Sequence, residues 1–249
     1  MGFKDRVYKV INEADLLLEV IDARFSKETR NEQIENLVKR KHKKLIIVIN
    51  KSDLVSKTTA MKIKKEITKD FETTFVSSTK KSGIVALRNN ISRLAGKEKI
   101  KIGVLGYPNV GKSSIINALS GRHSAKTSIT AGYTRGEQLI NLGKNIQLID
   151  LPGIIPFHER NEAMLALIAV KSPNQVKDIQ EVGEKILAIL KQQNPTALKA
   201  MGLKNLEKDE EELLEELAFN RNRLLKGGKP DTTAVAKMLL MDWQKGKLK

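Results

Sequence analysis

A phosphate-binding loop is the clearest chemical pattern in this sequence. The stretch "GYPNVGKSS", residues 106–114, has the spacing Gly-x-x-x-x-Gly-Lys-Ser, follows an apolar run and precedes a helical pattern. Its glycines let backbone N–H groups converge on phosphate oxygens at the positive N-terminus of a helix. We expect Lys112 to reach the β- and γ-phosphates and the Ser113 hydroxyl to ligate magnesium. The candidate nucleotide-binding residues of this loop are Asn109, Val110, Gly111, Lys112, Ser113 and Ser114.

A second pattern on the phosphate side ends a later apolar run. Asp150-Leu151-Pro152-Gly153 begins 37 residues after Ser113. An Asp in this place would hold magnesium through a water, and the Gly153 N–H could sense the γ-phosphate. Asp, Pro and Gly also readily make a plain strand-ending turn, which is the alternative interpretation. The position at the end of a predicted strand, downstream of the phosphate loop, favours function.

The tetrapeptide "NKSD", Asn50 to Asp53, is typical of a guanine-reading segment. The Asp53 carboxylate can accept hydrogen bonds from N1–H and the 2-amino group of guanine, two donors that adenine lacks at those positions. A site built in this way discriminates by a factor of about 10⁴ or more. Asn50 can tie neighbouring loops together, and the stem of Lys51 can cover the base. Taken alone, a helix-capping Asp53 is the simpler interpretation, and the nearby phosphate loop favours the functional one.

A short polar segment follows the next predicted strand. Ser77, Ser78 and Thr79 could present backbone N–H groups to the guanine carbonyl. The segment is a weak signal by itself, and it gains weight from the base-reading tetrapeptide upstream.

Threonines between the phosphate loop and Asp150 are candidates for a mobile loop that senses the γ-phosphate. A Thr hydroxyl there can complete the magnesium shell when a triphosphate is bound. Thr127, Thr130 and Thr134 all compete for this role, and each of them could instead be an ordinary turn hydroxyl.

The elements that must position these residues form two domains. Residues 1–160 alternate short apolar runs with helical patterns, which is typical of a mostly parallel sheet flanked by helices. Beyond them helical patterns alone continue, so residues 161–249 should form a smaller all-helical C-terminal domain. The fold class is therefore α/β with a helical domain appended. The predicted strands are Asp15–Asp22, Lys44–Asn50, Thr73–Ser78, Lys99–Gly106, Glu137–Leu142 and Asn145–Asp150.

Composition bounds the location and the partners. Lys and Arg number 45 against 29 acids, a net charge of +16, which favours a polyanionic partner. Most of the excess lies in the first domain: residues 1–160 carry 30 bases and 16 acids. Without cysteine there are no disulfides or thiolate metal sites, and no apolar run is long enough to cross a membrane. We expect a soluble, cytoplasmic protein with no membrane partner.

The motifs stand in an unusual order along the chain: base reader, Ser77 segment, phosphate loop, mobile loop and DLPG. An ordinary GTPase begins with the phosphate loop. This order resembles the circularly permuted GTPases, specifically the YlqF/YawG family of ribosome-assembly GTPases, and the resemblance covers nearly the whole chain. One departure is visible, because the Gly-His-Met element that opens bacterial members has no counterpart here. The motifs that carry the resemblance are "DAR" (22–24), "TRN" (29–31), "GYPNVGKSS" (106–114), "AGYTRGEQ" (131–138), "DLPGI" (150–154) and the tail "LLKGGKPDTTAVAKMLLMDWQKGKL" (224–248).

The resemblance implies GTP and GDP as ligands, and it assigns further roles. The switch threonine of the family falls on Thr134, so Ser113, Thr134 and Asp150 would hold magnesium, and Lys112, Thr134 and Gly153 would serve catalysis. Asn109 matches an Asn that holds potassium in related GTPases, although a loop-shaping Asn is the alternative. Ile154 stands where many GTPases have a water-positioning Gln, which implies slow intrinsic hydrolysis, stimulated by the ribosomal particle and by potassium.

The implied partner is the precursor of the large ribosomal subunit with its rRNA. Aromatic residues make up only 4% of the chain, so contacts to structured RNA should go to its backbone and shape. No DNA partner and no oligomer are expected. A signalling GTPase with a protein effector, and a nucleotide-stabilised RNA-binding module with vestigial hydrolysis, are the alternatives. The basic clusters are Lys39–Lys44, Lys62–Lys65, Gly96–Lys101 and Arg221–Lys229.

Overall fold

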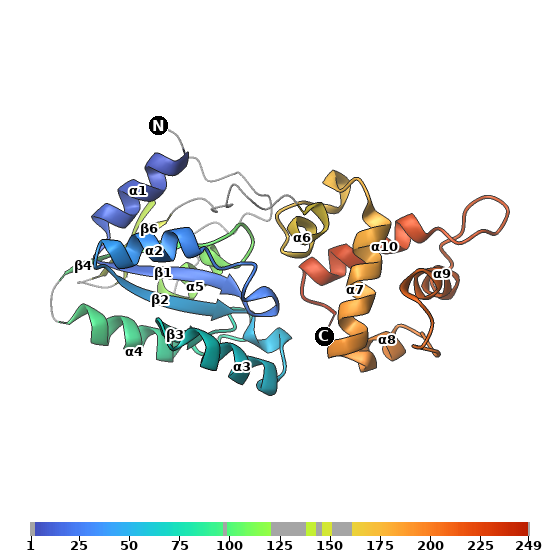
Figure 1. The fold of residues 1–249 in the computed structure, drawn as a ribbon, viewed down its shortest axis with the longest axis horizontal. Coiled ribbons are helices and arrows are strands. Elements are labelled where there is room, and N and C mark those ends of the chain that lie inside the picture. Colours follow the sequence, from blue (N-terminus) through green and yellow to red (C-terminus); the bar gives the residue numbers. More distant parts are fainter. Residues whose placement is uncertain (1–2, 97–98, 121–137, 143–145, 151–160, 249) are drawn as a thin grey trace. The chain divides into compact units, whose positions relative to one another are not determined.

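The structure, a computed structural model, describes residues 3–96, 99–120, 138–142, 146–150 and 161–248 (Figure 1). The chain divides into two compact units, Met1–His158 and Glu159–Lys249. Each unit has its own hydrophobic core, and each is described by itself.

A six-stranded sheet forms the centre of the first unit. Its strands lie in the order β3-β2-β1-β4-β6-β5. Neighbouring strands run parallel except β5, which pairs antiparallel with β6. The strands are β1 (Leu16–Asp22), β2 (Lys44–Asn50), β3 (Glu72–Phe75), β4 (Ile100–Leu105), β5 (Gln138–Leu142) and β6 (Ile146–Asp150).

The central strands are apolar along their length because helices cover both faces of the sheet. All seven residues of β1 are buried, as are six of the seven in β2. The register pairs Asp22 with Asn50 and Val104 with Asp150. The carboxyl ends of β1, β2, β4 and β6 therefore share one edge of the sheet, which is where an open α/β sheet binds its ligands.

Helices cover both faces of the sheet (Figure 1). One core combines side chains of α1, α2 and α3 with Leu17, Ile47 and Leu105 of the sheet. On the other face α4 contacts α5, and the Arg88 guanidinium donates to the carbonyl oxygens of Ala118 and Leu119. The helices are α1 (Phe3–Glu13), α2 (Glu32–Arg40), α3 (Lys57–Ile67), α4 (Ile84–Ala95) and α5 (Lys112–Ser120), with short 3₁₀ turns η1 (Ala23–Phe25) and η2 (Ser52–Leu54).

A carboxyl group is buried in the middle of β1. The Glu19 side chain is 1% exposed, and its Oε1 accepts a hydrogen bond from the Asn31 N–H at 2.7 Å. Oε2 has no hydrogen-bond partner among the residues that the structure describes. Burial raises the pKa of Glu19 well above its usual value, and the nearby Glu35 carboxylate raises it further. Glu19 is therefore expected to be protonated over a wide range of pH.

Replacing Glu19 by Gln should flatten the dependence of stability on pH. An acid whose folded pKa is raised stabilises fully below its unfolded pKa, and this contribution is lost as pH rises towards the folded value. In that window the native chain should lose up to about 1.4 kcal/mol of unfolding free energy per pH unit relative to the variant. Urea unfolding between pH 5 and pH 8 measures this, with the exposed Glu28→Gln as control. Parallel curves for the native chain and Glu19→Gln would contradict the buried, protonated carboxyl.

The second unit consists of helices α6 (Glu162–Leu167), α7 (Ile179–Gln193), α8 (Pro195–Ala200), α9 (Glu210–Asn220) and α10 (Thr232–Gln244), with a 3₁₀ turn η3 (Pro173–Gln175). α7 packs against α10 and α9. Trp243 is 3% exposed, and its indole N–H donates to the Leu167 carbonyl oxygen at 3.0 Å, which ties α10 to α6. An Asp or Asn side chain caps the N-terminus of each of these five α-helices, and each accepts a hydrogen bond from the backbone N–H three residues further on. These caps are Asn161, Asp178, Asn194, Asp209 and Asp231.

The predicted α/β class with a helical appendage is confirmed. The described strands overlap all six predicted ones, and β2 has the predicted bounds. The third strand is shorter than predicted, ending at Phe75, because Ser77 already pairs across a turn with Ser82. No helix among the described residues is long and apolar enough to cross a bilayer.

Candidate functional site

The phosphate loop leaves β4 through a glycine that the sheet requires. Gly106 has φ +138°, and a Cβ there would lie 2.3 Å from the Val20 carbonyl oxygen. Any side chain would therefore push the loop away from β1. Tyr107, the next residue, is 4% exposed, so the start of the loop is packed into the unit rather than projecting from it.

The loop then turns into α5. Asn109 has φ +60° and Gly111 has φ +102°, both in the left-handed region. A Cβ on Gly111 would lie 2.1 Å from Asn50 Nδ2, so only glycine fits beneath that amide. α5 begins at Lys112, which places the half-buried Ser113 and Ser114 in its first turn, where backbone N–H groups have no helical partner. This arrangement suits an anionic ligand.

Lys112 crosses the loop beneath its backbone. Its side chain is almost completely enclosed, with 8% of the residue exposed. The ammonium donates to the carbonyl oxygens of Tyr107 at 2.7 Å and Gly106 at 3.1 Å. A cation is thereby held at the centre of the cradle.

Asn50 joins three segments that are far apart in the sequence. Its Nδ2 donates to the Val110 carbonyl oxygen at 2.8 Å, a contact across 60 residues. Its Oδ1 accepts the Ser78 N–H at 3.2 Å. Asn50 is 1% exposed, so both bonds are shielded from water. The "NKSD" tetrapeptide, the phosphate loop and the Ser77 segment therefore meet at one amide group.

Asp53 lies in η2, beside the Ser77 segment. Ser77 Oγ donates to Asp53 Oδ1 at 2.7 Å, and it lies 3.2 Å from Thr79 Oγ1. Ser77 is fully buried, whereas Thr79 is exposed. The serine hydroxyl fixes one carboxylate oxygen of Asp53, and this orients the carboxyl group for a second set of hydrogen bonds.

Lys51 occupies a strained position between these residues. Its φ is +57°, which is uncommon for a residue with a side chain. Its ammonium lies 2.8 Å from Asp22 Oδ2, at the end of the neighbouring strand. In the sequence, Asp22 belongs to the "DAR" motif, and this motif is the signal from which the ion pair with Lys51 could be predicted.

Several predicted site residues lie outside the described part of the chain: the three candidate threonines Thr127, Thr130 and Thr134, and also Gly153 and Ile154. The backbone of Asp150 is described as the last residue of β6, paired with Val104 two positions before Gly106. Its backbone therefore stands beside the base of the phosphate loop.

The donor groups near the loop suit a hard cation that shares its ligands with phosphate. Among the described residues no group of three or more His, Cys, Asp and Glu side chains could hold a metal by itself. Magnesium is commonly held by one or two protein oxygens together with waters and substrate phosphates. Ser113 in the first turn of α5 is placed to supply such an oxygen. Chemically, the site combines an anion cradle, an enclosed cation and an oriented carboxylate.

Comparison with protein families gives two matches. The model described as "RsgA GTPase" matches residues 9–159, which is more than half of the chain. The model described as "50S ribosome-binding GTPase" matches residues 101–223, from β4 into the second unit.

Individual relatives extend the likeness over almost the whole chain. The uncharacterized GTP-binding protein MJ1464 of Methanocaldococcus jannaschii is 39% identical over 250 residues, covering 98% of this chain and 65% of its own length. Nuclear/nucleolar GTPase 2 of Arabidopsis thaliana is 36% identical, covering 97% of this chain and 43% of its own length. The chain thus spans less than two thirds of the length of these relatives.

Solved structures share the fold. GDP-bound YlqF superposes with a TM-score of 0.70 at 24% identity, over 97% of this chain and 95% of the other. GNP-bound YlqF from T. maritima gives a TM-score of 0.69 at 22% identity, over 98% and 94%.

Proposed function

The chain belongs to the circularly permuted GTPases, the family described by the RsgA GTPase model, and on that premise we propose that it binds and hydrolyses GTP as a switch in assembly of the large ribosomal subunit. The contact to the particle would be made to ribosomal RNA. Relatives named as nucleolar GTPases, and the match to a family described as ribosome-binding, support this role.

The main support for the nucleotide site comes from the hydrogen bonds of the Asn50 side-chain amide. Its hydrogen bonds to Val110 and Ser78 bring the base-reading tetrapeptide and the phosphate loop to one edge of the sheet. Asp53 would then bind N1–H and the 2-amino group of guanine, while the loop N–H groups and Lys112 bind the phosphates.

The magnesium ion in this proposal would be held by Ser113, Asp150 and Thr134 together with phosphate oxygens, and it would neutralise charge on the phosphates when bound. Ser113 lies in the first turn of α5, which follows the phosphate loop, and the backbone of Asp150 pairs with Val104 in the strand that leads into the loop. Lys112 supplies the other positive charge, from a position that water barely reaches.

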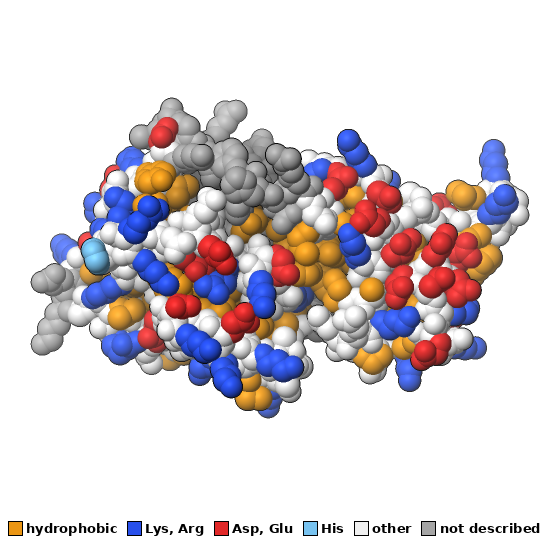
Figure 2. All heavy atoms as spheres, viewed as in Figure 1, with side chains coloured by type: hydrophobic (Ala, Val, Ile, Leu, Met, Phe, Trp, Pro, Cys, Tyr) orange, Lys and Arg blue, Asp and Glu red, His pale blue; other side chains and the backbone are white. Residues whose placement is uncertain are grey.

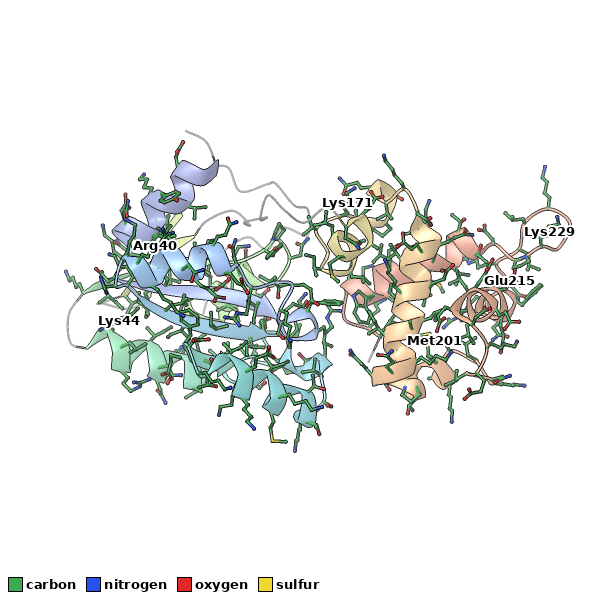
Figure 3. All side chains as sticks on the ribbon, in the orientation of Figure 1. Arg40, Lys44, Lys171, Met201, Glu215 and Lys229 are labelled. Carbon is green, nitrogen blue, oxygen red and sulfur yellow. The ribbon has the colours of Figure 1, made fainter. Side chains whose placement is uncertain are left out.

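Contact with RNA is supported by basic side chains that form no ion pair within the described part of the chain. Two lysines of the first basic cluster have structural roles instead: Lys43 donates to the Asn12 and Ala14 carbonyl oxygens, and Lys44 to that of Leu94. The loop between α9 and α10 differs, because its residues 221–229 are all exposed. Figure 3 labels Lys229 on this loop. Its four bases, none in an ion pair among the described residues, are Arg221, Arg223, Lys226 and Lys229.

Charge is distributed differently over the two units. Figure 2 shows Lys and Arg side chains spread over the visible face of the first unit, whereas Asp and Glu side chains gather over α9 in the second. The first turn of α9 alone holds Glu210, Glu211 and Glu212. An RNA partner should therefore bind through the first unit and the loop 221–229 rather than through the face of α9.

The test is sedimentation of the protein with ribosomal particles in lysate, with GDP or with a non-hydrolysable GTP analogue. We expect association with a large-subunit precursor in the triphosphate state. Association should weaken steeply with salt, and alanine at the four bases of the loop should make the salt dependence shallower by about three in log–log slope. The control variant replaces four other exposed lysines of the second unit with alanine: Lys199, Lys204, Lys237 and Lys245.

The rival functions predict different outcomes. A signalling GTPase would not sediment with ribosomal particles in either nucleotide state, and its binding to a protein partner would respond little to salt. An RNA-binding module with vestigial hydrolysis would sediment equally with GDP and with the analogue. Either result would overturn the proposed switch in ribosome assembly.

Potassium is proposed as a second cation, held through Asn109 beside the bond between the β- and γ-phosphates. The left-handed φ of Asn109 also fits the loop-shaping alternative, so the support for potassium is the match of Asn109 to a potassium-holding Asn in related GTPases and the inability of Ile154 to orient the attacking water by hydrogen bonding. We expect faster GTP hydrolysis in potassium than in sodium salts at equal ionic strength, and further stimulation by the ribosomal particle. Equal rates of phosphate release in the two salts would contradict the potassium site.

The protein is further proposed to act as a monomer in the cytoplasm. Sedimentation equilibrium tests the oligomeric state, and cell fractionation tests the location.

A further inference from the structure

A buried carboxylate, that of Asp22, lies at the end of the strand between the base-reading strand β2 and the phosphate-loop strand β4. Asp22 ends β1, which lies between β2 and β4, and its register partner in β2 is Asn50. The Asp22 side chain is 2% exposed. It accepts hydrogen bonds from Lys51 Nζ at 2.8 Å and from Arg24 Nη2 at 2.8 Å. The "DAR" motif thus contacts the residue that follows Asn50.

The position of this carboxylate is fixed from several directions. Arg24 Nε and the Arg24 backbone N–H both donate to Asp22 Oδ1, at 3.1 and 3.0 Å. The Asp22 backbone N–H donates to Thr29 Oγ1 at 3.0 Å, and the Thr29 hydroxyl donates to the Phe25 carbonyl oxygen at 2.6 Å. Asp22 also caps η1. A bidentate guanidinium and a capped turn leave the carboxylate little freedom to rotate.

Lys51 depends on this carboxylate electrostatically. Burial lowers the pKa of Lys51 and the nearby Arg24 lowers it further, while Asp22 opposes both. Burial would raise the pKa of Asp22, but Lys51 and Arg24 outweigh it and hold that pKa well below its usual range. The three groups therefore form a charged cluster in which one carboxylate compensates two cations. Removal of the carboxylate would leave the two cations to repel each other in a poorly hydrated place.

We propose that Asp22, locked by Arg24, is a positioning residue that holds Lys51 against the guanine site. This inference rests on the proposed nucleotide binding and gives the "DAR" motif a role in it. With its ammonium anchored at Asp22, the aliphatic stem of Lys51 is fixed beside η2, which carries Asp53. The stem then forms a preformed wall for the base. Because the device lies on the base side of the site, it should act equally on GDP and GTP.

A double-mutant cycle on Asp22 and Lys51 tests the inference. Dissociation constants for GDP and GTP are measured on the full chain for Asp22→Asn, Lys51→Met and the double variant. Each single change should raise both constants by about 10- to 100-fold. The double variant should bind no more weakly than the weaker single variant, because Asp22 has nothing left to position. For GTP hydrolysis KM should rise while kcat stays within about twofold.

Two further variants separate positioning from folding. Glu35→Gln breaks a partly buried ion pair with Arg30 that involves neither Asp22 nor Lys51, and it should lower stability without changing nucleotide affinity. If Asp22→Asn does not fold, Asp22→Glu keeps the charge but displaces it by one methylene. Its smaller loss of affinity should disappear in the Lys51→Met background, which is expected to fold because Asp22 keeps Arg24.

The outcomes are distinguishable. If the effects of Asp22 and Lys51 multiply in the double variant, Asp22 supports the fold alone and the positioning role is overturned, while nucleotide binding by the native chain stands. If the native chain binds neither GDP nor GTP, the proposed function fails first and the inference falls with it. A loss confined to GTP would also overturn it, because that would place Asp22 on the side of the γ-phosphate.

Discussion

Asn in place of Asp53 should change the base preference from guanine to xanthine. The carboxylate of Asp53 is oriented by the Ser77 hydroxyl, 2.7 Å from Oδ1. An amide in its place can still accept N1–H, but its NH₂ group would face the 2-amino group of guanine, and two donors would then meet. Xanthine has a carbonyl oxygen at that position and accepts from the amide. We expect the ratio of GDP to XDP affinity to fall by about 10⁴, the discrimination typical of sites that hydrogen-bond their ligand.

Competition of GDP and XDP against a fluorescent guanine nucleotide measures this ratio. The control is Asp70→Asn, because Asp70 is exposed just after α3 and its carboxylate forms a surface ion pair with Lys39. An unchanged order of preference in Asp53→Asn would mean that the base is read elsewhere, although the phosphate loop could still bind nucleotides.

Loss of the Lys112 ammonium should have the largest effect on turnover. Lys112 is 8% exposed and reaches Tyr107 and Gly106 through hydrogen bonds that cross the loop. Removal of one preorganised donor from a charge-stabilising site costs about 10²- to 10³-fold in rate. We expect Lys112→Ala to lower kcat/KM for GTP by at least that factor, with weaker nucleotide binding as well, because in the proposed site the lost charge would face the phosphates in ground and transition states alike.

Single-turnover hydrolysis with excess enzyme checks this expectation, and Lys101→Ala is the matched control. Lys101 lies in β4, the strand that leads into the loop, but its side chain is exposed.

The variant Lys112→Ala also separates two proposed functions. A switch protein should lose both hydrolysis and cellular function, whereas a nucleotide-stabilised RNA-binding module should keep RNA binding and cellular function alike.

The buried strands could be predicted from sequence because their signal is local. Lys44–Asn50 is an apolar run that ends at a polar residue, and the structure gives β2 the same bounds. Such runs are explained by helices that cover both faces of the sheet. The α/β class follows from these runs and the helical patterns between them, without knowledge of any particular contact.

The end of the third strand could not be predicted in this way. The sequence favours a strand over Thr73–Ser78, yet β3 ends at Phe75. Ser77 exchanges backbone hydrogen bonds with Ser82, and the Ser78 N–H binds the side chain of Asn50. The competing partner of Ser78 lies 28 residues away, so no window around the strand contains the deciding information.

The residues of the candidate site likewise fall into those predicted from a local pattern and those brought together only by the fold. Patterns with fixed spacing indicate Asn50, Lys112 and Ser113, because the chemistry of base reading and of phosphate binding restricts residue types at neighbouring positions. The pair of Asp22 with Lys51 spans 29 residues and two strands, and only the fold brings it together. The unusual position of Glu19 is visible in the sequence, since a charged residue inside an apolar strand is uncommon. The roles of Thr134 and Gly153 stay predictions.

The place of β4 in the sheet has a consequence for synthesis of the chain. β1, β2 and β3 precede β4 in the sequence, yet β4 pairs with β1 and completes its second edge. On a translating ribosome the first three strands emerge while β1 still has an unpaired, apolar edge, the kind of surface that promotes wrong pairing. That edge closes only when residues 100–105 leave the exit tunnel. The nascent polypeptide therefore passes through an interval in which this edge is exposed and the phosphate loop, which follows β4, has not yet been made.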